Sequence, residues 1–364
     1  MTQQQWGRQP RWGQPPRRGW NQPGRQPYPL PQAYRQYPPA GFGQNPYGQV
    51  YAPNQFLPPR RRKRHPFRGL LMAALVIAAI AWVGMAMTNT VSEAPAGAYE
   101  NEDYRVPPPD ATPPPLPVPE TYEEAEQILV SSTFYEQTAP APVRCEAQPV
   151  NVRTARNAEL RSHFEALMEC LVRVWQPPVD AAGFQVVRPT VTIYGARVTT
   201  KCGDAEVNAF YCAGDQQVYF SNQLADYVPI VRRDRWAADV VMAHEFGHAV
   251  QARTAILISS HALGQQSGDQ QVELELSRRL EVQADCLSGM FMRSVSQSLG
   301  IEEADLEGIR NTYEAVGDDV VSGKPNVVGN HGLARSREYW GNVGLGTDAV
   351  GRCNSFTAQD NLVR

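Results

Sequence analysis

An uncharged apolar segment lies directly behind a basic cluster and divides the chain in two. Gly69 to Met87 contains no charged residue, and a helix needs roughly 20 apolar residues to cross a bilayer. Positive residues stay on the cytoplasmic side of such a helix. We therefore expect a basic membrane flank over 60–68, a transmembrane helix over 69–88 and a single-pass cell-membrane protein with its N-terminus in the cytoplasm.

Two alternatives to the spanning helix remain open. A secretory signal peptide has a shorter apolar region near the N-terminus, whereas 68 residues precede this segment. Later cleavage beside Ala94, Ala96 or Ala98 remains an alternative. The length of the segment and its lack of charge favour spanning over a buried core helix, so the lipid bilayer is an expected partner.

The N-terminal tail, residues 1–59, is built of Pro, Gln, Gly, Tyr and Arg without apolar periodicity. Such a composition cannot bury a core, so we expect a disordered cytoplasmic tail. The first 68 residues hold 12 of the 34 basic and none of the 37 acidic residues, which leaves a formal charge of −15 (22 − 37) for the rest. Contact with anionic lipid or nucleic acid is an alternative, but scattered arginines favour a solvated linker, and no nucleic-acid partner is expected.

The chain beyond the apolar segment is predicted to contain a stalk and a domain. Residues 89–119 are rich in Pro, Ala and acidic residues, which predicts an extended stalk, and the folded extracytoplasmic domain is expected over 120–364. Helical patterns occur at Asn157–Trp175 (ended by Pro177 and Pro178), Asp234–Thr254, Val272–Gln297, Glu302–Val316 and after Gly332. Strand patterns occur at Thr190–Tyr194 and Gln217–Phe220. The predicted fold class is α+β, mainly helical with a small sheet.

The strongest chemical signal is an HExxH pattern formed by His244, Glu245 and His248 in an apolar, helix-forming context. Histidines at i and i+4 project from one face of a helix and can hold one Zn²⁺, while the glutamate lies beside the activated water. An ordinary amphipathic helix is the alternative. The pattern predicts His244 and His248 as metal ligands and Glu245 as a catalytic residue.

A second helical run carries Glu281 and Asp285, which share a helix face. A catalytic zinc needs a third protein ligand, and a carboxylate from a second helix can supply it. Asp285, one turn later, is expected to accept the free ring N–H of a ligating histidine. A solvated helix face, or an ion pair with Arg278 or Arg279, is the alternative for these carboxylates.

All six cysteines lie beyond the apolar segment, which suggests an oxidising compartment and three disulfides. Buried thiols or zinc ligands are alternatives, although no CxxC pair is present, and six cysteines allow 15 pairings. The cysteines are Cys145, Cys170, Cys202, Cys212, Cys286 and Cys353.

Together these motifs resemble the bacterial neutral zinc metallopeptidase family of membrane-anchored proteins, a group of the gluzincin type. The resemblance extends over about 202–356. Its specific segments are His244–Gln251, Glu281–Cys286, the Ala315–Asp319 run AVGDD, and His331 with Gly332. The run Leu333–Arg337 departs from the family pattern. Among the residues after Gly332, only Arg337, Trp340 and Gly344 keep that pattern. This departure leaves the metal ligands untouched and concerns substrate binding.

The resemblance implies a zincin-like metallopeptidase domain with Zn²⁺ as its cofactor. It also implies the disulfides Cys202–Cys212 and Cys286–Cys353, which leaves Cys145 with Cys170. The expected function is zinc-dependent hydrolysis of peptide bonds in a peptide or protein substrate outside the cytoplasmic membrane.

The proposed catalytic roles extend beyond the metal ligands. Glu245 acts as general base and then acid, and His331 either stabilises the oxyanion or has a plain structural role. Further oxyanion candidates are Tyr211, Tyr219 and Tyr339. Two other histidines are expected to face solvent, His163 on a helix surface and His261 in a polar loop.

Two other functions remain alternatives. In the first, the outer domain is a zinc-stabilised, catalytically inactive binding or scaffold protein of the cell envelope. The departures near His331 favour this hypothesis. In the other, the N-terminal tail is the functional part and recruits a partner. The sequence indicates neither the substrate nor the oligomeric state.

Overall fold

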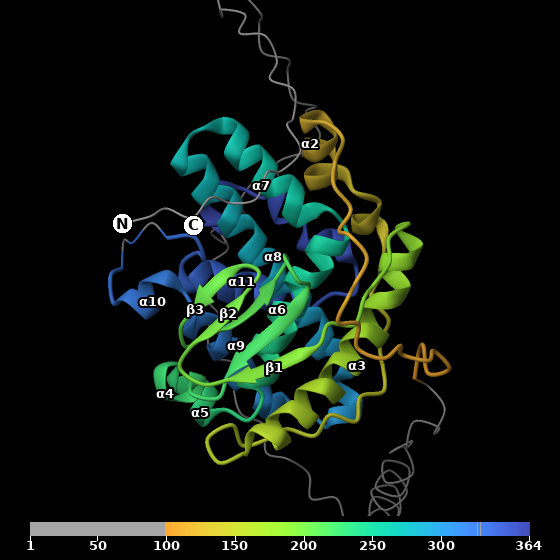
Figure 1. The fold of residues 1–364 in the computed structure, drawn as a ribbon, viewed down its shortest axis with the longest axis vertical. Helices are drawn as coiled ribbons and strands as arrows, with labels where there is room; N and C mark the ends of the chain where they lie inside the picture. The colour runs from red at the N-terminus through yellow and green to blue at the C-terminus, as the bar shows by residue number, and fades with distance from the viewer. Residues whose placement is uncertain (1–98, 326, 328) are drawn as a thin grey trace, which may run out of the picture. The chain divides into compact units, whose positions relative to one another are not determined.

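A computed structural model describes residues 99–325, 327 and 329–364 (Figure 1). The expected tail, the basic flank and the predicted transmembrane helix at 69–88 lie outside the described residues. Within the described part of the chain, no helix is both long enough and apolar enough to cross a bilayer.

The described chain is mainly helical with a small sheet, which confirms the predicted α+β class. Its α-helices are α2 (Tyr122–Ser131), α3 (Asn157–Ala181), α4 (Leu224–Tyr227), α5 (Pro229–Arg233), α6 (Ala237–Arg253), α7 (Ile256–Ser267), α8 (Gln270–Leu299), α9 (Glu303–Ala315), α10 (Asp318–Ser322) and α11 (Ala334–Leu345). Short 3₁₀ helices are η1 (Thr133–Glu136), η2 (Val350–Cys353), η3 (Ser355–Thr357) and η4 (Asp360–Leu362). The strands are β1 (Val191–Tyr194), β2 (Val198–Thr200), β3 (Gly203–Ala205), β4 (Ala209–Cys212) and β5 (Gln217–Ser221).

The larger sheet has the strand order β1-β5-β4. Strand β5 is central and buried along its whole length. It pairs in parallel with β1, with Val191 opposite Val218, and antiparallel with β4, with Phe210 opposite Tyr219. Strand β4 is therefore an edge of the described sheet, and it packs on α6.

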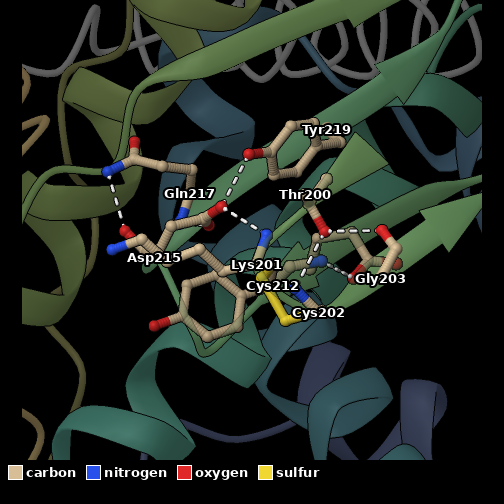
Figure 2. The surroundings of a disulfide bond; sticks show 10 residues. Thr200, Lys201, Cys202, Gly203, Cys212, Asp215, Gln217 and Tyr219 are labelled. Atoms are coloured by element: carbon tan, nitrogen blue, oxygen red, sulfur yellow. Dashed lines mark hydrogen bonds between the residues drawn. A yellow bond between two sulfur atoms is a disulfide. The ribbon is translucent and has the colours of Figure 1, made fainter. Parts of the chain in front are cut away.

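Strands β2 and β3 form a separate antiparallel hairpin. The disulfide Cys202–Cys212 joins this hairpin to the end of β4 (Figure 2). A small apolar cluster that includes Tyr194, Tyr219 and Phe210 lies against this disulfide. A two-stranded hairpin of this size is marginal by itself, so the disulfide and the cluster fix its place on the sheet.

Helix α6 lies in the centre of the described fold, between β4 and α8. Of its 17 residues, 15 are buried, so it lacks the polar face of a surface helix. Its close contact with α8 depends on Gly247, because a Cβ at this position would lie 3.1–3.2 Å from Cα, Cβ and the carbonyl oxygen of Ala284. The helix that carries HExxH is therefore a core element, held tightly against the second motif helix.

The six cysteines form three disulfides, Cys145–Cys170, Cys202–Cys212 and Cys286–Cys353. This is the pairing that the family resemblance implied. The third disulfide begins at the residue after Asp285 and joins α8 to η2, so it braces the helix that carries the second motif.

Most predicted elements are present, with small shifts at their ends. The expected strands correspond to β1 and β5, and the expected helices correspond to α6, α8, α9 and α11. Strands β2, β3 and β4 and helices α2 and α7 were not predicted. Helix α7 occupies a segment that was expected to be a polar loop.

The predicted end of α3 at Trp175 is wrong, because the helix continues through Pro177 and Pro178 to Ala181. A proline inside a helix removes the hydrogen bond to the carbonyl oxygen four residues earlier. For Pro177 that oxygen belongs to Arg173, and the side-chain amide of Asn101 donates to it at 2.6 Å. A contact distant in sequence therefore satisfies the group that proline leaves free.

The described part of the expected stalk, 99–119, contains no helix or strand, yet it is bound to the domain. The carbonyl oxygen of Pro114 accepts hydrogen bonds from the side chains of Gln216 at 2.8 Å and Arg253 at 3.2 Å. The N–H of Asp110 donates to the carbonyl oxygen of Arg188 at 2.9 Å. The packed chain thus begins before Glu120.

Candidate metal centre

The two histidines of the HExxH motif lie on one face of α6. His244 and His248 are separated by about one helical turn, and their ring centroids lie 4.7 Å apart. Their Nε2 atoms face each other across 3.1 Å. This arrangement suits two nitrogen ligands of a single ion.

Glu281 reaches the same point from α8. Its two carboxylate oxygens lie 3.3 Å from Nε2 of His244 and 3.4 Å from Nε2 of His248. Ligand atoms of all three residues lie within 4.8 Å of one another. Their side chains are only 9–14% exposed, so the three donors converge in a largely buried site that still has access to solvent.

The separations among these donors are close to those that a zinc ion requires. Tetrahedral Zn²⁺ with bonds of about 2.0–2.2 Å to histidine nitrogen and carboxylate oxygen places neighbouring donors about 3.3–3.6 Å apart. The two histidine nitrogens lie 3.1 Å apart, and one oxygen of Glu281 lies 3.3 Å from His244 while the other lies 3.4 Å from His248. Two imidazoles and one carboxylate are also the donor set of one known class of catalytic zinc site, in which the fourth position stays open.

Asp285 lies behind the first histidine. Its Oδ1 is 2.8 Å from Nδ1 of His244, and since an ionised carboxylate only accepts, Nδ1 is the donor. This bond leaves Nε2 of His244 available as a ligand. The predicted contact between Asp285 and a motif histidine is therefore present.

Arg337 of α11 completes this part of the site. Its Nε and Nη2 donate to the two oxygens of Asp285 at 2.8 and 2.9 Å, and its Nη1 donates to the carbonyl oxygen of Val316 at 3.2 Å. Nη2 also lies 3.7 Å from Glu281. A bidentate guanidinium fixes the plane of the carboxylate, so Arg337 orients Asp285 and, through it, the ring of His244.

The second histidine has a different, uncharged partner. Nδ1 of His248 lies 2.8 Å from Oε1 of Gln251. The amide nitrogen of Gln251 donates to the carbonyl oxygen of Leu280 at 2.8 Å and to Oε1 of Gln283 at 3.0 Å. Gln283 in turn donates to the hydroxyl of Tyr135 at 3.0 Å. This buried amide chain holds the ring of His248 with Nε2 facing the other donors.

Charges within the cluster control its protonation. Burial lowers the pKa of His244, but Asp285 and Glu281 more than offset this effect and raise it to about 10 in the metal-free protein. Burial raises the pKa of Glu281, yet His248 and His244 hold it well below its usual range. Because a histidine ligand must be deprotonated, a metal ion at this site would have to displace the proton of His244.

Glu245 lies beside the donors without belonging to the three-residue cluster. One of its oxygens accepts the backbone N–H of Tyr211, on strand β4, at 2.9 Å. Burial raises the pKa of Glu245, whereas His244 and His248 lower it by a smaller amount. The edge strand therefore positions a buried carboxyl group of raised basicity next to the predicted ligands.

His331 lies in the segment between α10 and α11, and its side chain is 49% exposed. Asp318 anchors it: one carboxylate oxygen lies 3.3 Å from Nδ1, and the other accepts the N–H groups of His331 and Gly332 at 3.0 and 2.8 Å. Asp318 raises the pKa of His331, with a smaller contribution from Glu281. His331 is thus within electrostatic reach of the cluster but is not one of its three members.

The three tyrosines considered for the oxyanion have different environments. Tyr211 offers its backbone N–H to Glu245. The hydroxyl of Tyr219 donates to Asp215 at 2.8 Å on the hairpin side of the sheet (Figure 2). Tyr339 is exposed on α11. Tyr219 is therefore committed to a contact away from the metal cluster.

The expectations for two further histidines need correction. His163 does not face solvent: it is buried, and its Nε2 lies 2.6 Å from Oδ1 of Asp239 on α6. His261 is exposed as expected, but it lies on α7 rather than in a loop. The apolar spacing on α3 could not reveal that His163 meets Asp239 on α6.

Comparison with known proteins identifies the family. The family model described as "Putative neutral zinc metallopeptidase" matches residues 127–356, which is more than half of the chain. The chain belongs to this family. The match includes all three donors, Glu245 and Asp285.

Two bacterial relatives match this chain over about half of its length. The uncharacterized protein YpfJ of Escherichia coli (strain K12) is 30% identical over 195 residues, which cover 50% of this chain and 66% of the relative. The uncharacterized protein Rv2575 of Mycobacterium tuberculosis is 29% identical over 210 residues, 51% of this chain and 67% of the relative. The chain thus spans about two thirds of the relatives it matches. No solved structure matches it significantly.

Several residues of the site were not assigned by sequence reasoning. Gln251 belongs to the first motif and lies three residues after His248, on the same helical face, which is a usable signal. Asp318 lies within the AVGDD run without any spacing that predicts its partner. The roles of Arg337 and of the Tyr211 N–H depend on α11 and β4 packing against the motif helices, and no local pattern announces such contacts.

Proposed function

We propose that this domain hydrolyses peptide bonds with a zinc ion held by His244, His248 and Glu281 in a zincin-like site. The supporting observation is the convergence of three donors, 3.1–3.4 Å apart, beside a buried carboxyl group, Glu245, that is not one of them. Structural zinc sites are closed by four protein ligands, whereas catalytic sites keep one position open.

Glu245 is the general base in this proposal. Bound zinc supplies a Lewis acid that activates water and polarises the scissile carbonyl group. Glu245 takes a proton from the attacking water and passes it to the leaving amine. The N–H of Tyr211 holds one oxygen of Glu245, which leaves the other oxygen to exchange the proton.

His331 stabilises the negative charge that develops on the carbonyl oxygen. Asp318 occupies its Nδ1 side, so Nε2 is the atom that remains to donate to substrate. The raised pKa of His331 favours the donating form near neutral pH.

The compartment and the domain boundaries are part of the same proposal. Three disulfides suit an oxidising environment, and residues 60–68 followed by 69–88 suit a basic flank and a single membrane-spanning helix. The domain would then act on peptide or protein substrates outside the cytoplasmic membrane, with 1–59 as its cytoplasmic tail. Residues 89–98 would connect the membrane-spanning helix to the domain.

The test compares the full-length wild type with Glu245→Gln, both purified in detergent. We expect about one zinc per chain in both proteins by metal analysis. Mass spectrometry of a proteome-derived peptide library should detect new cleavage products with the wild type only. Loss of the base should lower the rate by about 100-fold or more.

A matched control is Glu338→Gln, which changes a carboxylate on α11 outside the donor cluster and should keep both zinc and cleavage. Equal zinc content with no cleavage by the wild type would instead favour the zinc-stabilised binding or scaffold protein. Wild-type protein without zinc after purification in zinc-containing buffer would contradict both functions.

A further inference from the structure

A pocket separate from the metal cluster lies between α8, α9 and α11. Its volume is about 320 Å³, at the lower end of the range for small-molecule sites. It is lined near the C-terminal ends of α8 and α11, by Met292, Arg293 and Ser296 and by Asn342, Leu345 and Gly346. Along α8, Met292 is 11 residues beyond Glu281, about 16 Å at the rise of a helix, so the pocket is distinct from the metal site.

The pocket has an apolar lining with charged groups of both signs. Its charged members are Arg293, Arg310, Glu302 and Glu303, and its apolar members are Met292, Ile301, Leu306, Ile309 and Leu345. Such a combination matches neither a purely apolar ligand nor a simple anion, because each would leave one kind of lining group without a partner.

Helix α9 orders three of these groups along one face. Glu303, Leu306 and Arg310 follow the i, i+3, i+7 spacing, so an acid, an apolar side chain and a cation succeed one another. The two charged positions are about 10.5 Å apart along the helix axis. An extended peptide advances about 3.3–3.6 Å per residue, so this span suits the two ends of a peptide of two or three residues.

The charged groups are incompletely paired among the described residues. Arg310 donates through Nε to the side chain of Asn342 at 2.8 Å, and no carboxylate of the described chain lies within ion-pair distance of it. Arg293 approaches Asp348 only at 3.9 Å, and its Nη1 has no partner there. Glu302 lies at the N-cap of α9, where its backbone N–H donates to Asp305 at 2.9 Å; Glu303, in the first turn, lies on the same helical face as Leu306 and Arg310 and is the acid that we assign to a ligand.

We propose that this pocket binds a short zwitterionic peptide of two or three residues with an apolar side chain. The α-ammonium group pairs with Glu303, the α-carboxylate pairs with Arg310, and the side chain packs on Leu306 and its apolar neighbours. The pocket is a second binding site of this domain. Its occupancy does not depend on cleavage at the metal centre.

Binding is measured by titration calorimetry on the full-length, zinc-loaded Glu245→Gln protein. The probes are leucyl-leucine, N-acetyl-leucyl-leucine and leucyl-leucinamide. We expect saturable binding of leucyl-leucine and at least tenfold weaker binding of the two blocked probes, since each lacks one charge. Because binding is measured without turnover, failure of the proposed peptidase activity would leave this test unaffected.

Variants assign binding to the pocket. Arg310→Gln should weaken the probes with a free carboxylate at least tenfold and spare leucyl-leucinamide, while Glu303→Gln should weaken the probes with a free ammonium group and spare N-acetyl-leucyl-leucine. The exposed Glu303 can change without loss of a core contact, which protects the test if Arg310→Gln folds poorly. Arg233→Gln, an exposed change on α5, is the control. Unchanged leucyl-leucine affinity in both pocket variants, or no binding at millimolar probe, would overturn the proposal.

Discussion

At the scale of single residues, the three-donor cluster depends on side chains that are not among its three members. Arg337 and Asp285 are almost fully buried and form a bidentate pair, and Asp285 holds the ring of His244. Groups behind a metal ligand typically change metal affinity by 10–100-fold when they are removed. The positioning of His244 therefore depends on a helix that carries none of the three donors.

The first prediction concerns Arg337→Gln. This change leaves the buried carboxylate of Asp285 without its cation, so we expect a loss of about 3–5 kcal/mol in unfolding free energy and a 10–100-fold loss in zinc affinity. Urea unfolding and chelator competition measure the two effects. Arg335→Gln, an exposed position on the same helix, should change neither by much; equal behaviour of the two variants would contradict the role of Arg337.

His163 and Asp239 provide a prediction on pH. Burial lowers the pKa of His163, but the carboxylate of Asp239 outweighs it and raises the pKa; burial also raises the pKa of Asp239. Both groups therefore bind protons more tightly in the folded chain, so their contribution to stability falls as pH rises. The stabilising contribution of His163 is fully present below the unfolded pKa of about 6.5. This contribution is lost as the pH rises through the higher pKa of the folded state.

The measurement compares wild type with the neutral double variant His163→Gln/Asp239→Asn. We expect the stability advantage of the wild type to be largest below about pH 6.5 and to shrink toward alkaline pH. Urea unfolding across this range at saturating zinc provides the values. A difference that stays constant with pH would show that the pair does not titrate as its contacts indicate.

At the scale of secondary-structure elements, the site requires a close approach of α6 and α8. Gly247 lies between the two histidines, against Ala284. Helix α8 carries Glu281 and Asp285 one turn apart, so a small outward shift of this helix moves both carboxylates from the histidines. The glycine in HEFGH is therefore a packing requirement of the three-donor cluster.

The next prediction compares Gly247→Ala with Gly264→Ala. Alanine favours a helix by about 1 kcal/mol over glycine, but at Gly247 its Cβ presses on the backbone of Ala284, and overpacking costs about 1–3 kcal/mol. We expect Gly247→Ala to lower zinc affinity and stability. At Gly264 the nearest atom belongs to the flexible side chain of Glu273, so alanine there should raise stability with zinc affinity unchanged. Equal effects at both sites would refute the packing argument.

At the scale of the whole described chain, the segment before Glu120 contributes to the fold. Pro114 accepts from Gln216 and from the buried Arg253, and Asp110 accepts from Gln217 through its carbonyl oxygen. Arg253 has no carboxylate partner within ion-pair distance among the described residues, so carbonyl oxygens solvate its charge. The proline-rich run thus supplies acceptors around Arg253 in addition to the carbonyl oxygen of Gln185.

The prediction at this scale compares proteins that comprise 99–364 and 120–364. Removing the segment leaves buried donors without hydrogen-bond acceptors, and each such donor costs about 1–3 kcal/mol. The shorter protein should therefore unfold at lower urea concentration. Substituting Arg253→Met in the shorter protein should recover part of the loss. Equal stability of the two lengths would show that the segment is dispensable.

Much of this protein could be derived from its sequence, because the strongest signals are local. Helical spacing placed α6, α8, α9 and α11, and the i, i+4 pattern of His244 and His248 together with Glu281 and Asp285 placed the donor cluster. Where prediction failed, a distant contact was the cause: Asn101 lets α3 continue through its prolines, and Asp239 buries a histidine that the pattern of α3 left facing solvent.

The sequence by itself therefore predicted the three-donor cluster and the helices that carry it, because a helix repeats every 3.6 residues and brings near neighbours onto one face. Only the tertiary structure decided which groups orient those ligands. Arg337 from α11, the N–H of Tyr211 from β4 and the pocket beyond Met292 each depend on separate elements packed against the motif helices. The position of such a contact follows from the packing of the whole chain, so no periodic residue pattern in the sequence indicates it.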